Sequence, residues 1–183
     1  MSAENLHVGV IGATGAVGVE LINVMFDRNF PVGELTLFAS ERSAGKTVET
    51  KFGTKTVALF SVEEAKQCDI VFLAVSGDFA KEYGPKIAEG ALVIDNSSAF
   101  RLNDDVPLIV PEINGHLAKT AKLIANPNCT TAIAAVALWP LHQAFGLKKV
   151  IVSTYQAASG SGQPGMNELR EGLAAGLAGK PIP

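Results

Sequence analysis

Short runs of β-branched and apolar residues alternate along the chain with longer stretches in which apolar residues recur at helical spacing. This alternation is typical of βαβ units and a mostly parallel sheet. Helical spacing covers residues 16–27 and 79–89. Apolar and polar residues alternate over residues 46–59, as expected for an excursion of two strands from the main sheet. The pattern predicts an α/β fold with a Rossmann-like, doubly wound sheet. Its expected strands are residues 7–11, 35–39, 70–75, 92–95 and 123–125.

The pattern changes character near residue 128. Residues 129–145 are expected to form a helix that Pro140 should kink or interrupt. Residues 148–155 are expected to form a strand, and residues 167–180 an amphipathic helix. These elements indicate the start of a second domain of α+β type.

The composition fits a soluble globular protein, because 48% of the 183 residues are hydrophobic and 18% are charged. This length suits one full domain and part of another, so we predict a nucleotide-binding domain over residues 1–127 and the beginning of a second domain over residues 128–183. The net charge of −3 and the lack of a basic run argue against a nucleic-acid partner. Because no apolar run approaches the roughly 18 residues of a membrane span and no signal-peptide pattern opens the chain, we expect a cytoplasmic protein with no membrane partner.

Three glycines, Gly12, Gly15 and Gly18, follow the first expected strand and open the first expected helix. Glycine there lets the backbone approach a pyrophosphate at the positive end of the helix. The G-x-x-G-x-x-G spacing differs from the commonest dinucleotide fingerprint, but the strand before it and the helix after it supply the required context. We predict dinucleotide binding here, the alternative being a purely structural tight turn.

The loop after the second strand carries Glu41, Arg42 and Ser43, which point to different cofactors. An acidic residue such as Glu41 holds a ribose hydroxyl and favours NAD. Arg42 with Ser43 suits the 2′-phosphate of NADP through charge-assisted hydrogen bonds, and we expect NADP for this reason. The alternative is a solvated charged loop.

Two cysteines occur in different settings. Cys129 follows Asn128, a plausible N-cap, and therefore lies in the first turn of an expected helix. A thiol at the positive end of a helix dipole is favoured as thiolate, the form that a covalent acyl carrier needs. Cys68 precedes a strand and is expected to be a small buried apolar residue.

Polar clusters follow two other strands, at the edge of an α/β sheet where ligands bind. Arg101 is suited to a phosphate or carboxylate, although a lone loop arginine is commonly a surface ion-pair partner. Gln156 could orient a carbonyl, and Ser159 with Gly160 would admit a flat ring; the alternative there is a flexible glycine turn.

Six motifs, in order from residue 8 to about residue 165, resemble the aspartate-semialdehyde dehydrogenase family: GATGAVG, SERSAGK, DNSSAFR, VPEIN, NPNCTT and YQAASGSG. Six motifs in register are highly specific. The resemblance implies an NADP-binding domain followed by a catalytic and dimerisation domain, in a homodimer or homotetramer. It implies no metal.

The resemblance also implies a role for each candidate residue. Cys129 would form an acyl thioester with the substrate, Arg101 would bind the phosphate group and Gln156 would orient the substrate. The implied cofactor-binding residues are Thr14, Gly15, Ala16 and Val17 at the pyrophosphate, Arg42 and Ser43 at the adenosine phosphate, and Ser159 with Gly160 at the nicotinamide.

The implied reaction is the NADP-dependent reductive dephosphorylation of L-4-aspartyl phosphate to L-aspartate 4-semialdehyde, a step that serves lysine, threonine and methionine biosynthesis. The family's catalytic histidine lies in a later stretch, and His7, His116 and His142 are poor substitutes for it. The chain is therefore expected to stop inside its second domain and to be inactive alone. Alternatives are N-acetyl-γ-glutamyl-phosphate reductase, against which NPNCTT and RSAGK argue, and a non-catalytic NADP-binding fragment.

Overall fold

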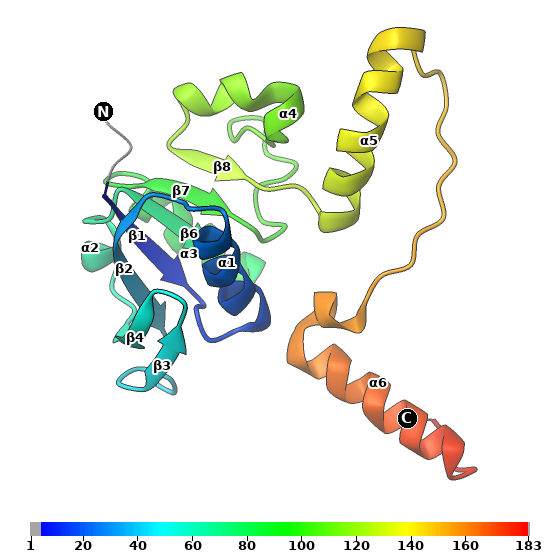
Figure 1. Cartoon of the computed structure of the whole chain (residues 1–183), viewed down its shortest axis with the longest axis horizontal. Coiled ribbons are helices and arrows are strands. Elements are labelled where there is room, and N and C mark those ends of the chain that lie inside the picture. The colour runs from blue at the N-terminus through cyan, green and yellow to red at the C-terminus, as the bar shows by residue number, and fades with distance from the viewer. Residues whose placement is uncertain (1–4, 183) are drawn as a thin grey trace. The chain divides into compact units, whose positions relative to one another are not determined.

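The computed structural model describes residues 5–182 (Figure 1). The chain forms two compact units, Met1–Leu147 and Lys148–Pro183. The first unit holds the whole sheet, and the second consists of an extended stretch and a helical part. The predicted boundary near residue 128 stays a prediction.

A six-stranded parallel sheet organises the first unit, in the order β5-β2-β1-β6-β7-β8. The chain starts at β1 in the middle and moves to β2 on one side, then to β6 on the other. The strand order therefore reverses at β1, and the carboxyl end of β1 is the topological switch point where ligands bind in such sheets. The strands are β1 (Leu6–Ile11), β2 (Val32–Ala39), β5 (Ala58–Leu59), β6 (Ile70–Leu73), β7 (Leu92–Asp95) and β8 (Leu123–Ala125).

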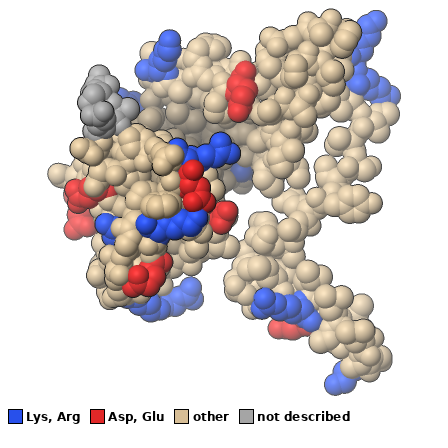
Figure 2. Space-filling model, viewed as in Figure 1, with Lys and Arg blue, Asp and Glu red and all other residues tan. Residues whose placement is uncertain are grey.

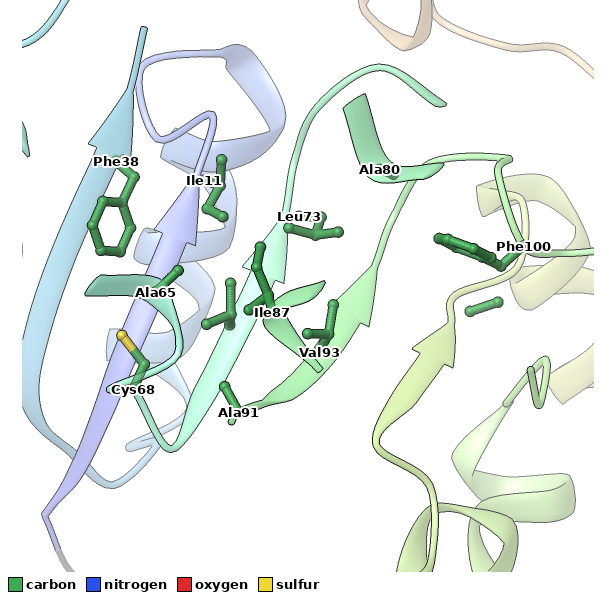
Figure 3. Close-up of a cluster of buried hydrophobic side chains, with 12 residues drawn as sticks. Ile11, Phe38, Ala65, Cys68, Leu73, Ala80, Ile87, Ala91, Val93 and Phe100 are labelled. Atoms are coloured by element: carbon green, nitrogen blue, oxygen red, sulfur yellow. The ribbon is translucent and has the colours of Figure 1, made fainter. Parts of the chain in front are cut away.

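Helices cover both faces of the sheet because alternate residues of each strand point to opposite faces. Val10 of β1 packs with Ile22 of helix α1 (Ala16–Asp27) in one buried cluster. The neighbouring Ile11 belongs to a second cluster, shown in Figure 3, which includes Leu73 of β6 and Ile87 of helix α3 (Gly77–Ile87). The sheet is thus the middle of three layers.

Shorter elements complete the first unit. Strands β3 (Thr47–Thr50) and β4 (Gly53–Thr56) form the expected antiparallel excursion. Helix α2 (Val62–Ala65) precedes β6, and helices α4 (Pro111–Asn114) and η1 (Gly115–Lys119) precede β8. Basic and acidic side chains are interspersed on the face shown in Figure 2.

The predicted fold class and most predicted elements are confirmed. The predicted helix over residues 16–27 has the same bounds in the structure. The second strand begins at Val32, three residues earlier than expected, and the third ends at Leu73. Helix α3 begins at Gly77, two residues early, because the hydroxyl of Ser76 accepts a hydrogen bond from the Phe79 amide and caps it.

One expectation beyond β8 is wrong and another is partly open. Helix α5 (Cys129–Phe145) is continuous through Pro140, so the proline does not interrupt it, and a kink there stays a prediction. Residues 148–155 form no strand, because β-branched residues favour a strand only beside a pairing partner and none of the described residues pairs with them. Helix α6 (Gly162–Leu177) begins five residues earlier than predicted, after the short helix η2 (Ala158–Ser161). No helix within residues 5–182 is long and apolar enough to cross a membrane.

Candidate active site

The glycine turn joins β1 to α1 in a conformation that needs glycine. Gly12 has φ +84, and a Cβ atom there would lie 2.2 Å from the carbonyl oxygen of Ala74. A Cβ atom on Gly18 would lie 2.4 Å from the carbonyl oxygen of Gly12. Gly12 therefore permits the sharp turn, and Gly18 lets α1 pack directly against it.

The N-terminus of α1 is open to a ligand. Its N-cap is Gly15, which has no side chain to bond the first amides of the helix, and Thr14, Gly15, Ala16 and Val17 are all exposed. The first amides of a helix lack partners within the helix, and the helix dipole is positive there. This end of α1 is therefore suited to a pyrophosphate, as predicted.

A cleft of about 390 Å³ lies at the carboxyl ends of β1 and β2. The glycine turn contributes Gly12 and Thr14 to it, and the loop after β2 contributes Ser40 to Ser43. Apolar side chains form another part of its lining: Ile11, Leu59, Phe60, Val75 and Phe79. The cleft thus joins a pyrophosphate site, an apolar surface and the residues Glu41, Arg42 and Ser43 that were predicted to select the cofactor.

Cys129 is the first residue of α5, and its side chain is exposed. The side-chain oxygen of Asn128 accepts a hydrogen bond of 3.1 Å from the Thr130 amide, so the predicted N-cap is confirmed. The thiol therefore lies at the positive end of a helix of 17 residues.

Cys68 lies in the opposite environment. Its side chain is 3% exposed and packs in the cluster of Figure 3. Burial raises the pKa of the Cys68 thiol to about 11, and the nearby charges of Glu34 and Asp69 act in the same direction. Because the thiol stays protonated near neutral pH, Cys68 is a structural residue.

Arg101 is fixed at the carboxyl edge of the sheet. Its Nε donates a hydrogen bond of 2.9 Å to the carbonyl oxygen of Asn126, and its Nη2 donates one of 3.0 Å to that of Asn96. Asn96 follows β7 and Asn126 follows β8, three residues before Cys129. The cation and the start of the helix that carries the thiol are therefore tied to the ends of two adjacent strands.

A buried carboxylate shapes the loop before Arg101. Asp95, the last residue of β7, is fully buried and accepts hydrogen bonds from the Ser97 amide at 2.9 Å and hydroxyl at 2.8 Å. The Ser97 hydroxyl in turn accepts one of 3.1 Å from the Ala99 amide. These bonds fix the turn that returns Arg101 to the sheet edge.

The remaining predicted residues lie in the second unit. Gln156 precedes η2, and Ser159 and Gly160 lie within it; all three are exposed. A Cβ atom on Gly160 would lie 2.7 Å from Nε2 of Gln156, so a side chain at position 160 would displace this glutamine. Their roles at the nicotinamide and the substrate stay predictions.

Two of the three histidines, His7 and His142, lie away from Cys129. His7 lies at the start of β1, the end opposite the glycine turn, where its Nε2 is 2.8 Å from the hydroxyl of Thr36. His116 is in η1, and His142 stacks on Trp139, with 5.8 Å between the ring centroids. His142 lies thirteen helical steps after Cys129 on α5, a rise of about 20 Å at about 1.5 Å per residue.

Asn96 and Asn126 belong to the site but were not predicted from the sequence. Their side chains bond each other, with Asn126 Nδ2 donating to Asn96 Oδ1 at 2.8 Å. The available signal was their position, since each follows directly on a strand of the parallel sheet.

Comparison with known proteins identifies the class. The family described as semialdehyde dehydrogenase, NAD binding domain, matches residues 7–121. A second description, semialdehyde dehydrogenase, dimerisation domain, matches residues 138–183. The chain therefore belongs to the semialdehyde dehydrogenase family.

Several relatives are described as aspartate-semialdehyde dehydrogenases. The aspartate-semialdehyde dehydrogenase of Aquifex aeolicus is 46% identical over 182 residues, which cover 97% of this chain and 54% of that protein. The crystal structure of aspartate semialdehyde dehydrogenase II from Vibrio cholerae, complexed with ASA, matches with a TM-score of 0.87 and 41% identity over 98% of this chain and 55% of that one. That of the Candida albicans enzyme with NADP has a TM-score of 0.58 and 28% identity, covering 79% and 48% of the two chains. The resemblance of the six motifs is confirmed, and the chain spans about half the length of the curated relatives it matches.

Proposed function

We propose that this chain supplies the cofactor site and the nucleophile of an NADP-dependent aspartate-semialdehyde dehydrogenase. The observation that carries the proposal is the placement of Cys129 at a helix start beside the two strand ends that hold Arg101. A cation and a polarised thiol at the edge of a nucleotide-binding sheet suit an acyl phosphate, whose phosphate leaves as the thioester forms. The names of the relatives support the aspartyl substrate over the N-acetyl-γ-glutamyl alternative.

In the proposed reaction, the thiolate of Cys129 attacks the acyl carbon of L-4-aspartyl phosphate. A carbon–sulfur bond forms, the carbon–oxygen bond to phosphate breaks, and inorganic phosphate leaves beside Arg101. When bound, NADPH would supply a hydride to the thioester carbon. The carbon–sulfur bond then breaks, which gives L-aspartate 4-semialdehyde and returns the thiolate of Cys129. Covalent catalysis thus divides one acyl reduction into two easier steps.

The residues of the cleft fit NADP. Gly12 and Gly18 hold the turn tightly against the sheet and α1, and the exposed amides at the start of α1 suit the pyrophosphate. Arg42 is exposed on the lining of the cleft, where its guanidinium would bind the 2′-phosphate together with Ser43. Glu41 lines the same cleft and would repel that phosphate, so we assign the preference to Arg42.

Further parts of the proposal concern the whole protein. Gln156 would orient the substrate, and Ser159 with Gly160 would lie against the nicotinamide. The match to a dimerisation domain supports a homodimer or homotetramer. The enzyme would act in the cytoplasm, in lysine, threonine and methionine biosynthesis.

The test is a spectrophotometric assay of NADPH formation from aspartate semialdehyde, NADP and phosphate. It compares this chain with one extended to the length of its relatives, and with the Cys129→Ala variant of the extended chain. We expect full turnover only in the extended chain with its thiol. This chain should bind NADPH but turn over at least about 100-fold more slowly, because the catalytic histidine implied by the resemblance lies in a later stretch and a positioned acid–base group contributes about 10²–10⁴-fold. Turnover by the Cys129→Ala variant would overturn the proposal, and turnover by this chain within tenfold of the extended one would show that one of its own histidines transfers the proton.

A further inference from the structure

We propose that Asn96 and Asn126 form an amide latch that positions Arg101 for the anion it binds. The proposal rests on the proposed function for the identity of the anion, whereas the latch itself rests on the geometry at the ends of β7 and β8. Neither asparagine needs to touch the substrate. Both would act through Arg101 as positioning residues.

The contacts form a closed cycle. The backbone carbonyls of Asn96 and Asn126 accept the two hydrogen bonds that hold the Arg101 guanidinium. The side chains of the same two asparagines bond each other at 2.8 Å. Each acceptor of the arginine is therefore tied to the other acceptor, and the spacing of the two carbonyls is fixed from both sides.

The latch is anchored to the sheet. The backbone amide of Asn96 donates to the carbonyl oxygen of Leu73 on β6 at 3.1 Å, and its side-chain Nδ2 donates to the same oxygen at 3.3 Å. The amide of Asn126 donates to the carbonyl oxygen of Asp95 at 2.8 Å. The two strand ends thus stay in register beyond the last paired residues, Asp95 and Ala125.

This arrangement selects which edge of the guanidinium is offered to a ligand. A guanidinium has five N–H donors in a rigid plane, and here Nε and one donor of Nη2 are bonded to carbonyls. The end of the group, where the second donor of Nη2 lies parallel to one donor of Nη1, is suited to a bidentate contact with phosphate. Arg101 is half-buried, so its orientation depends on these two carbonyls rather than on a rotamer free in solvent.

The test measures hydrogen exchange of the Arg101 Nε–H group by NMR, together with a titration by inorganic phosphate. Asn126→Leu removes the donor of the latch at an exposed position and keeps a side chain of similar size. We expect exchange at Arg101 Nε–H to become faster by about tenfold, the factor that 1.4 kcal/mol represents, and the affinity for phosphate to fall by about the same factor. Asn126→Ala, which removes the side-chain amide without adding a charge near Arg101, should also speed up exchange and serves as the second variant.

Asn114→Leu is the matched control. The side chain of Asn114 also makes two hydrogen bonds to the backbone, accepting from the Val110 amide at 2.8 Å and donating to the carbonyl oxygen of Leu108 at 2.9 Å. It makes no bond to Arg101 or to its two acceptors. This variant should lose stability but leave Arg101 Nε–H exchange unchanged. A double variant, Asn96→Leu with Asn126→Leu, should change exchange no more than the larger single effect if the two act as one unit.

The outcomes separate the latch from the proposed function. Faster exchange in the Asn126 variants, without any response of Arg101 to phosphate in the unaltered chain, supports the latch and overturns the phosphate role. Unchanged exchange in both Asn126 variants overturns the latch, whatever phosphate does. Equal effects of Asn114→Leu and Asn126→Leu on Arg101 would also overturn it, because the change would then follow from general loss of stability.

Discussion

Replacing Gly18 by alanine tests how tightly α1 packs on the glycine turn. In an ordinary helix interior this change stabilises a protein by about 0.5–1 kcal/mol, because alanine loses less conformational freedom than glycine. Here the added Cβ atom would lie 2.4 Å from the carbonyl oxygen of Gly12 and 2.8 Å from the Cα of Ala13. Carbon atoms are in favourable contact at about 3.5–4.0 Å, so the helix must shift.

The magnitude follows from what has to move. Both close atoms belong to the backbone of the turn, which Gly12 holds by hydrogen bonds of 3.0 Å to Phe38 and to Gly15. Overpacking costs about 1–3 kcal/mol, and a backbone clash belongs at the upper end. After the helix-propensity gain is subtracted, we expect Gly18→Ala to lower the free energy of unfolding by about 2 kcal/mol. The same shift would move the α1 amides away from the pyrophosphate and weaken NADPH binding by about tenfold.

Urea unfolding followed by far-UV circular dichroism measures the stability, and NADPH fluorescence measures the binding. Gly176→Ala is the matched control: Gly176 is exposed within α6, and a Cβ atom there would meet only the side chain of Ile182, at 3.9 Å. This control should leave the transition unchanged or raise its midpoint. A Gly18→Ala variant as stable as the unaltered chain, with undiminished NADPH binding, would refute the packing argument.

Three further predictions concern charge and thiols. Arg42→Ala should weaken NADPH binding by about 1.5–3 kcal/mol, the range for hydrogen bonds to charged groups, with NADH binding almost unchanged. Calorimetric titration measures both affinities, and Arg28→Ala is the control. Equal losses for the two cofactors, or the same loss in the control, would contradict the prediction. Cys129 should react with iodoacetamide near neutral pH before Cys68 does, because Cys129 is exposed and the pKa of Cys68 is raised to about 11; peptide mapping after brief alkylation would disprove this by finding the label first on Cys68. Stability should fall between pH 9 and 11, because the native Cys68 keeps a proton that the unfolded chain, with a pKa near 9.0, releases. Urea unfolding at several pH values measures the free energy of unfolding across this window. That of Cys68→Ala should fall by about 2–3 kcal/mol less than that of the unaltered chain, at about 1.4 kcal/mol per pKa unit. An equal fall in both proteins would refute the raised pKa of Cys68.

The first βα unit could be predicted from sequence because its signals are local. The apolar run before Gly12 and the helical spacing after Gly15 occur within 27 residues, and the structure matches them closely. The N-cap of α5 is equally local, since Asn128 bonds the amide of Thr130, two residues away. Residues 148–155 show the limit of such signals, because a strand depends on a partner that its own sequence does not specify.

The arrangement around Arg101 required the structure. Asn96 and Asn126 are 30 residues apart, and their side chains meet only because β7 and β8 pair in the register that sets Asp95 opposite Ala125. Arg101 was predicted to lie near a sheet edge, with a surface ion pair as the alternative. Its hydrogen bonds to two backbone carbonyls show that the loop itself holds the cation.

The central claim is that Cys129 carries the acyl group, and trapping that group tests it most directly. A chain extended to the length of its relatives would be mixed with aspartate semialdehyde and NADP without phosphate, quenched in acid and mapped by mass spectrometry, with Cys129→Ala as control. We predict an aspartyl thioester on the peptide that contains Cys129, released by hydroxylamine and absent from the control. An acyl adduct on any other residue, or turnover without an adduct that persists in the Cys129→Ala variant, would contradict the account.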